Sequence, residues 1–253
     1  MKRVGCFRLA AVAALLLAAL SSCNTGDIPI DRRENWQFAT RYAASHREAW
    51  NAVWADFDIP LDVAEAVIFP ELVRYNQIQD AIEISSLEAA YPEEGIHGCD
   101  YSVGRFQMKP SFVEDLEKRW MRSGLGKRYG LVFDTAETVE ARQERLLRLK
   151  SEEGQCRYLA IYLRMLYLDY GSKDKDGRVK QAGLETLPAA EQVYLAATAY
   201  NHGTRWASPG SGSLERIRAV AAEKTFPLPN LWRTNYKNYS YGELAARYYS
   251  QAF

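Results

Sequence analysis

The sequence predicts an all-α protein. Apolar residues recur at helical spacing through most of the chain from Trp36 onward, whereas the alternation typical of strands is scarce. The segment 158–168 is apolar around most of its circumference, which a helix tolerates only when other helices surround it. We therefore expect a single helical domain over residues 36–253, with this segment as its central helix.

The expected helices follow one another along this domain. The first covers 36–54, a second begins after Pro60, and an amphipathic third covers 76–90 and is stopped by the proline and glycine of 91–95. The charged stretch 171–177 lacks the twelve-residue pattern of a calcium loop, so we interpret it as a solvated turn. After a loop that reaches residue 111, the remaining helices are expected at 112–122, 135–150, 155–170, 189–200 and 213–223.

The chain opens with the pattern of an export signal. Three basic residues precede an apolar run at 9–20, and this run is too short to span a bilayer as a stable helix. We therefore expect residues 1–22 to be removed during export, so that they take no part in the folded domain.

The end of this signal matches a bacterial lipobox. Leu-Ser-Ser-Cys at 20–23 combines a branched apolar residue, two small residues and a cysteine whose sulfur takes a diacylglycerol. Cys23 would be the lipidated first residue of the mature protein, and the polar segment 23–35 would tether the domain to the membrane. Bacterial lipoproteins with an aspartate after this cysteine tend to stay in the inner membrane. Asn24 stands there, which favours the periplasmic face of the outer membrane, with the inner membrane and the cell surface as alternatives.

Composition and charge limit the partners. Removal of Lys2, Arg3 and Arg8 from the 32 basic residues leaves 29 against 32 acidic residues, a net charge of −3, so we expect no nucleic-acid partner.

The 16 tyrosines and 6 tryptophans suit a groove that binds sugars. No heptad seam is evident, so we expect a monomer. The aromatic residues near the C-terminus are interpreted as a packing seam: Trp232, Tyr236, Tyr239, Tyr241, Tyr248 and Tyr249.

Cys99 and Cys156 are the cysteines that remain in the domain. In an exported protein such a pair can form a disulfide, which we expect here, with two separate buried thiols as the alternative. Their spacing fits no metal site, and no two of the histidines lie at ligand spacing on a helix. The sequence therefore predicts neither a metal nor another cofactor.

Three separated segments contain the candidate site. They are Val-Ile-Phe-Pro-Glu at 67–71, Ser-Val-Gly-Arg-Phe-Gln-Met-Lys-Pro at 102–110, and Ala-Tyr-Asn-His-Gly at 199–203. In order and spacing they resemble the motifs of the soluble lytic transglycosylase and goose-type lysozyme superfamily. The second resembles the glycine, apolar, Gln, apolar, x, Pro segment of that family, and the third its Ala-Tyr-Asn-Ala-Gly motif. The resemblance covers roughly residues 60–203 and implies a lysozyme-like helical fold.

This resemblance implies cleavage of the β-1,4 bond between MurNAc and GlcNAc in peptidoglycan glycan strands. Glu71 would protonate the leaving oxygen and then, as a carboxylate, deprotonate the 6-hydroxyl of the sugar, which closes a 1,6-anhydro ring without a protein nucleophile. Gln107 would line the cleft and position the sugar, and Tyr200 would bind or orient the glutamate. Asn201 would fix the loop or touch the substrate, and Gly104 would allow a close backbone approach.

The residues before Glu71 suit an acid that works near neutral pH. Such an acid must keep its proton well above the usual glutamate pKa of about 4.3. The apolar residues 67–69 favour burial, which raises the pKa of a carboxyl group because it disfavours the charged form. Pro70 disfavours helical dihedrals at the residue before it, so we expect the helix to break or kink just before Glu71 and direct it into a cleft.

Departures from the family pattern leave other functions open. Leu72 stands where the family commonly has serine, and His202 where it has alanine, which would suit an inactive glycan-binding or scaffold lipoprotein. A hydrolytic muramidase, which uses water in place of the 6-hydroxyl, is a further alternative. The long step from Glu71 to Gln107 implies an inserted helix near 76–90. Most glycosidases need a second carboxylate. We expect a solvated or structural role for the candidates, which are Glu83, Glu88 and Asp100.

Overall fold

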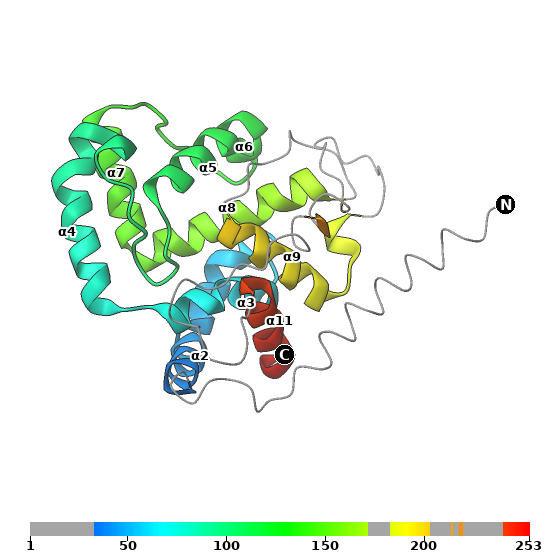
Figure 1. Ribbon diagram of the computed structural model, residues 1–253. Coiled ribbons are helices and arrows are strands. Elements are labelled where there is room, and N and C mark those ends of the chain that lie inside the picture. The colour runs from blue at the N-terminus through cyan, green and yellow to red at the C-terminus, as the bar shows by residue number, and fades with distance from the viewer. Residues whose placement is uncertain (1–32, 172–182, 203–213, 215–217, 220–239) are drawn as a thin grey trace.

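The computed structural model describes residues 33–171, 183–202, 214, 218–219 and 240–253 (Figure 1). Within these ranges the secondary structure is helical apart from one antiparallel bridge, so the predicted all-α class is confirmed. None of the described helices combines the length and the hydropathy needed to cross a membrane. The predictions that lie wholly or mostly outside these ranges concern the signal 1–22, Cys23 and its tether, the loop 171–177, the helix 213–223, and Trp232, Tyr236 and Tyr239.

Most of the helices predicted from the sequence are present, with ends shifted by a few residues. The first begins at Arg33, so the predicted tether 23–35 overlaps the folded domain by three residues. The short α6 and the C-terminal α11 were not predicted. In chain order the elements are α2 (Arg33–Ala55), α3 (Leu61–Arg74), α4 (Gln77–Glu94), η2 (Gly95–His97), α5 (Pro110–Ser123), α6 (Leu125–Arg128), α7 (Val139–Lys150), α8 (Glu152–Tyr170), η3 (Leu184–Thr186), α9 (Ala189–His202) and α11 (Tyr241–Ala252).

Helices α3 and α8 form the centre of the fold. Figure 1 shows α8 running through the middle of the molecule, with α4 and α7 packed together at one end and α3, α9 and α11 grouped below it. The predicted central segment is buried at most of its positions, which confirms its role. Helix α3 contacts α2, α8, α9 and α11, and every residue from Val63 to Val73 is buried.

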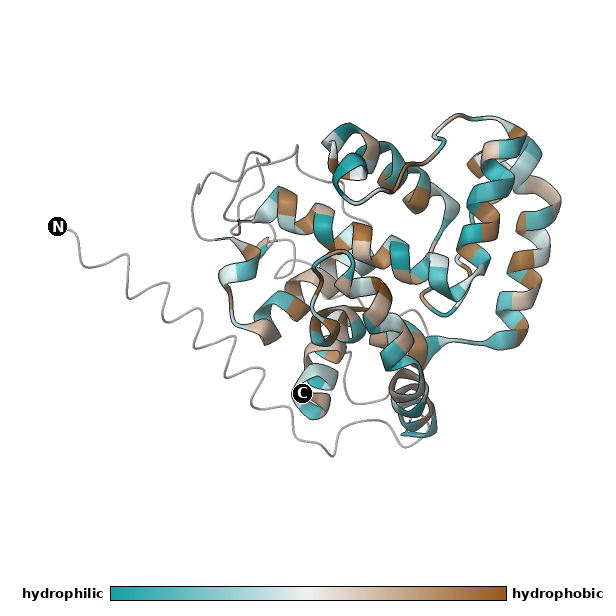
Figure 2. Ribbon diagram, turned by 180° about the vertical axis from the view of Figure 1, so that it is seen from behind, coloured by the Kyte–Doolittle hydropathy of each residue, from teal (hydrophilic) through white to brown (hydrophobic). Residues whose placement is uncertain are grey.

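The outer helices are amphipathic, as the periodicity predicts. Coloured by hydropathy, α4, α5 and α7 carry both apolar and polar segments (Figure 2). In α5, for example, Val113, Leu116 and Trp120 recur at helical spacing and are buried. These helices therefore cover the core with one face and meet solvent with the other.

Two prolines lie inside helices and do not end them. Helix α3 continues through Pro70 and Glu71 to Arg74, so of the predicted break or kink before Glu71 the break is wrong. Helix α4 likewise contains Pro92 and ends at Glu94, because the next residue, Gly95, has a φ of 66°, outside the helical region. A proline removes one N–H from the helical hydrogen bonds. In α3, burial on all sides outweighs that local loss, because tertiary packing overrides local preference.

The expected disulfide is also absent, since Cys99 and Cys156 are both free, buried thiols. Cys156 lies in α8, where its carbonyl oxygen accepts a hydrogen bond of 3.2 Å from Trp54 Nε1 of α2. Cys99 follows η2, beyond the C-terminal end of α4. The two buried thiols are thus separate, which is the alternative that the sequence left open. Burial raises the pKa of the Cys156 thiol and so keeps it protonated.

Candidate active site

The three predicted motif segments meet at one cleft with a volume of about 420 Å³. Its walls come from the last turn of α3, the loop before α5, the first turn of α5 and the last turn of α9. Glu71, Gln107, Tyr200 and Asn201 are thus brought together, although they are far apart in the sequence. The complete lining is Glu71, Arg74, Ser102, Gln107, Met108, Lys109, Phe112, Tyr200, Asn201 and His202.

Glu71 is the acid of this cleft, and it is almost wholly buried. Only 5% of its surface is exposed. Burial raises the pKa of its carboxyl group from 4.5 to about 6, while the nearby Arg74 and Tyr241 oppose that rise. A general acid works best when its pKa lies near the operating pH. Glu71 therefore has the burial and the pKa that the sequence predicts for such a group.

The two oxygens of Glu71 differ in their partners. Oε1 accepts a long hydrogen bond of 3.5 Å from Nη1 of Arg74, one turn later in α3. Oε2 lies 3.3 Å from the same nitrogen but has no hydrogen-bond partner among the described residues. Because native proteins leave few buried polar atoms unpaired, such an atom in a cleft indicates a functional position.

Tyr241, the first residue of α11, lies beside Glu71. It is fully buried, and its hydroxyl lies near enough to lower the pKa of Glu71 without meeting the geometry of a hydrogen bond. Ser240 and Glu243 form a capping box that fixes this end of the helix. Gly242 allows α11 to lie close to α9, since a Cβ there would be 2.4 Å from a threonine hydroxyl. The sequence placed Tyr241 in a packing seam and missed this position beside the acid.

Tyr200 lines the cleft, but its hydroxyl has another partner than the predicted one. Its hydroxyl donates to the carbonyl oxygen of Phe106 at 2.7 Å and not to Glu71. Its ring packs edge-on against Tyr162 and Phe112, with centroids 5.3 and 5.9 Å away. Burial and the nearby charge of Glu71 raise the pKa of its hydroxyl. Tyr200 therefore forms a wall of the cleft and ties α9 to the loop before α5.

The loop that carries Gln107 folds back on itself. Val103 and Met108 exchange two backbone hydrogen bonds of 3.0 and 3.1 Å. Between them, Gly104 and Gln107 have φ values of 75° and 52°, and such a value is uncommon for a residue other than glycine. The Gln107 amide donates to the carbonyl oxygen of Gly104 at 2.8 Å. Gln107 thus lines the cleft as predicted, but its amide nitrogen is engaged within the loop.

Gln155 of α8 supports this loop from below and was not singled out from the sequence. Its side-chain oxygen accepts from Phe106 N at 2.9 Å, and its amide donates to the carbonyl oxygens of Val103 and Leu149 at 3.2 and 2.6 Å. A Cβ on Gly104 would lie 1.5 Å from the Gln155 amide nitrogen, so the close approach predicted for this glycine is present. Its position one turn before the apolar segment 158–168 of the central helix was the signal that could have identified it.

The candidates for a second carboxylate lie outside the cleft. Glu83 accepts a hydrogen bond from a glutamine of α4, Glu88 pairs with a lysine of α7, and Asp100 binds the backbone N–H and hydroxyl of Ser111. Their contacts agree with the solvated or structural roles expected for these three residues. Among the described residues that line the cleft, Glu71 is the sole acid.

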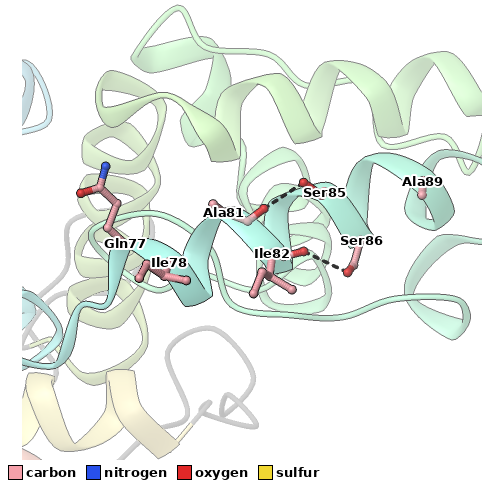
Figure 3. Close-up of a pocket in the computed structure, with 7 residues that line it drawn as sticks. All are labelled: Gln77, Ile78, Ala81, Ile82, Ser85, Ser86 and Ala89. Atoms are coloured by element: carbon pink, nitrogen blue, oxygen red, sulfur yellow. Dashed lines mark hydrogen bonds between the residues drawn. The ribbon is translucent and has the colours of Figure 1, made fainter.

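A larger hollow of about 810 Å³ lies along α4 but has no chemistry of this kind. All of its lining residues come from that one helix, and two of its serine hydroxyls donate to carbonyl oxygens one turn earlier (Figure 3). No titratable side chain belongs to the lining, which is Gln77, Ile78, Ala81, Ile82, Ser85, Ser86 and Ala89. The cleft at Glu71 is therefore the candidate active site.

The chemistry of that cleft has to be inferred from its own residues. Over the ranges that the structure describes, no group of three or more His, Cys, Asp or Glu side chains could hold a metal ion. No family model, no curated protein and no solved structure matches this chain.

Proposed function

We propose that the protein is a peptidoglycan lytic transglycosylase in which Glu71 serves first as acid and then as base. The observation that carries the proposal is the burial of Glu71, with a pKa of about 6, in the cleft that all three motif segments line. The substrate is the β-1,4 bond between MurNAc and GlcNAc, and the product ends in 1,6-anhydro-muramic acid. The lysozyme-like fold implied by the motifs belongs to the same proposal.

The first step transfers a proton to the oxygen of the leaving sugar, because an alkoxide is a poor leaving group. Burial of Glu71 supports this step, since it keeps the carboxyl group protonated up to about pH 6. Oε2 has no hydrogen-bond partner among the described residues, so it is the oxygen that presents the proton. When the glycosidic bond breaks, the proton remains on the leaving oxygen, and Glu71 becomes a carboxylate.

The second step uses this carboxylate as a base. Glu71 takes the proton of the 6-hydroxyl as that oxygen bonds to the anomeric carbon, which returns the glutamate to its acid form. Between the steps, the neighbouring Tyr241 favours the charged form. Glu71 is the sole acid in the described lining, which favours a mechanism with one carboxylate, helped by the N-acetyl group of the substrate.

The rest of the proposal follows from the N-terminal sequence. Lipidation of Cys23 would tether the domain at the periplasmic face of the outer membrane, within reach of the glycan strands. The protein would act there as a monomer and would need no cofactor.

Analysis of the reaction products tests this function. The protein without its export signal is incubated with purified peptidoglycan, and the released fragments are identified by mass spectrometry. We expect 1,6-anhydro-muramic ends from the wild type and none from Glu71→Gln. Glu83→Gln, which changes a glutamate outside the cleft, should cut like the wild type. Reducing ends would indicate a hydrolytic muramidase, and intact but bound sacculi would indicate a glycan-binding or scaffold lipoprotein.

A further inference from the structure

Arg74 is loosely held beside the acid. It lies one turn after Glu71, lines the same cleft, and exposes 23% of its side chain. Its Nη1 is 3.3 Å from Oε2 and 3.5 Å from Oε1 of Glu71. Charge-assisted hydrogen bonds between arginine and a carboxylate are typically about 2.7–2.9 Å long. The contact with Glu71 is therefore a weak ion pair, which a better-placed anion can replace.

Arg74 also has donor capacity that the described residues do not use. A guanidinium group carries five N–H donors in a fixed plane. Its Nε is buried and has no hydrogen-bond partner among the described residues, as is also true of Glu71 Oε2. Each such atom costs about 1–3 kcal/mol when it stays unpaired. Two of them in one cleft indicate that a ligand supplies the missing partners.

The charge of the cleft favours an anionic ligand. Arg74 and Lys109 carry permanent positive charges, and His202 is a third basic group. Lys109 forms a long ion pair of 3.9 Å with Asp100, which is not part of the lining. The sole acid in the described lining is Glu71, which is half neutral at about pH 6. An anion that enters the cleft therefore meets a net positive field.

We propose that Arg74 binds a carboxylate of the peptide stem on the glycan strand, and that this contact replaces the contact of Arg74 with Glu71. The planar fork of a guanidinium group matches a carboxylate through two parallel hydrogen bonds. The inference rests on the proposed function and goes beyond it, because it names the substrate group that the cleft recognises. It predicts that strands with peptide stems are preferred to bare strands.

Binding of the stem would then favour the protonated form of Glu71. While Arg74 is paired with Glu71, its positive charge favours the carboxylate, which cannot donate a proton. Once a stem carboxylate takes the guanidinium group, that attraction weakens, and the pKa of Glu71 rises in the bound complex. Binding of the stem leaves the other titratable groups near Glu71 or in the lining where they are. These groups are Tyr200 and His202 of α9, Tyr241 of α11, and Lys109 of the loop.

Titration of Glu71 in the absence of turnover tests the coupling directly. Glutamate side chains labelled with ¹³C are followed by NMR against pH, and the Glu71 signal is assigned by its loss in Glu71→Gln. The probe is muramyl dipeptide, which has a stem carboxylate but no glycosidic bond to cut. We expect both Arg74→Gln and the probe to raise the pKa of Glu71 by about one pH unit. The probe should have no effect in Arg74→Gln and a partial effect in Arg74→Lys.

The cleavage reaction supplies a second test, with strands whose stem carboxylates are free or amidated. We expect about a tenfold preference in kcat/KM for free carboxylates, lost in Arg74→Gln. Arg128→Gln is the matched control, because this exposed arginine pairs with Asp58 at 3.7 Å and lies outside the cleft. An unchanged Glu71 pKa in Arg74→Gln, or an equal preference in both proteins, would overturn the inference.

The two proposals fail in different ways. If sacculi stay intact while muramyl dipeptide still raises the pKa of Glu71 through Arg74, the lytic function fails and carboxylate binding stands. If anhydro ends form with no dependence on Arg74, the function stands and the inference is wrong.

Discussion

Helix α3 buries two glutamates, and their surroundings give them different roles. Glu65 is 0% exposed, accepts hydrogen bonds of 2.9 and 2.6 Å from Arg47, and accepts another from the Tyr248 hydroxyl. Glu71 is 5% exposed, and among the described residues the one hydrogen bond that it accepts is the long bond from Arg74. Burial is thus nearly equal at the two positions. The comparison teaches that pairing, more than burial, separates a carboxylate that is tied into the fold from one that is left available for chemistry.

Glu65 also helps to hold Glu71 in place. Glu65 joins α3 to Arg47 of α2 and to Tyr248 of α11. The Tyr248 ring stacks on Phe69 of α3, with centroids 3.5 Å apart and planes within 5°. These contacts fix α11, whose first residue lies beside Glu71. The structural carboxylate therefore supports the surroundings that raise the pKa of the other one.

Replacement of Glu71 by glutamine should have the largest effect on activity. Loss of a general acid and base typically lowers a rate by about 10²–10⁴-fold, and we expect about 10³-fold here. The free energy of unfolding at pH 7 should rise by up to about 2 kcal/mol, because glutamine keeps the size of the side chain and removes a buried, poorly paired charge. Release of anhydro fragments and urea denaturation measure the two quantities. Substantial remaining activity would move the chemistry to another residue.

The same substitution at Glu65 should act on stability. Glu65→Gln leaves Arg47 without its anionic partner, and breaking a buried ion pair costs about 3–5 kcal/mol. Since 35% of the Arg47 side chain is exposed, we expect a loss near the lower end, about 3 kcal/mol. Urea denaturation measures the loss. Glu83→Gln is the control, and a change at Glu65 no larger than the control would show that pairing does not make this carboxylate structural.

The two glutamine variants should also differ in how stability depends on pH. The folded-state pKa of Glu71, about 6, is above its usual 4.5, so between these values the folded protein binds more protons than the unfolded chain. Ionisation of Glu71 therefore lowers the free energy of unfolding as the pH rises from about 4 to about 7, by up to about 2 kcal/mol. This decline should be absent in Glu71→Gln. A difference between wild type and Glu71→Gln that stays constant with pH contradicts the raised pKa.

Removal of the Tyr241 hydroxyl should have the smallest effect. This hydroxyl lowers the pKa of Glu71, so Tyr241→Phe should raise that pKa and move the alkaline limb of the pH–rate profile to higher pH. The ring, and with it the packing of α11, stays in place. We expect a displacement below about one pH unit, measured as kcat/KM against pH. A displacement towards lower pH is the outcome that rules out this role.

Periodicity and motif spacing predicted much of this molecule. The central helix followed from residues 158–168, because a segment that is apolar on every side has no stable environment except among other helices. Glu71, Gln107, Tyr200 and Asn201 were placed in one site by the resemblance of their motifs to those of a known superfamily, and they line one cleft. The helix depends on pattern, which a single sequence contains, whereas the site depended on that resemblance.

The contacts that depend on packing were not predictable in this way. A tyrosine at a buried helical position suits a core as well as a site, so neither the Phe106 partner of Tyr200 nor the place of Tyr241 could be foreseen. The local preference of a proline to end a helix did not hold at Pro70, because the packing around α3 outweighs it. The predicted disulfide between Cys99 and Cys156 was wrong for a similar reason, because spacing along the chain does not determine which thiols meet.

The position of α11 in the chain has a consequence for the timing of activity. Helix α11 packs on α3 and α9, and it is the last described element to be synthesised. Before it docks, Glu71 lacks the burial that α11 contributes, so the rise in the pKa of its carboxyl group is incomplete. Under the proposed function, a chain whose α11 has not docked would therefore have a weaker general acid. Its folding would then be the event that activates it.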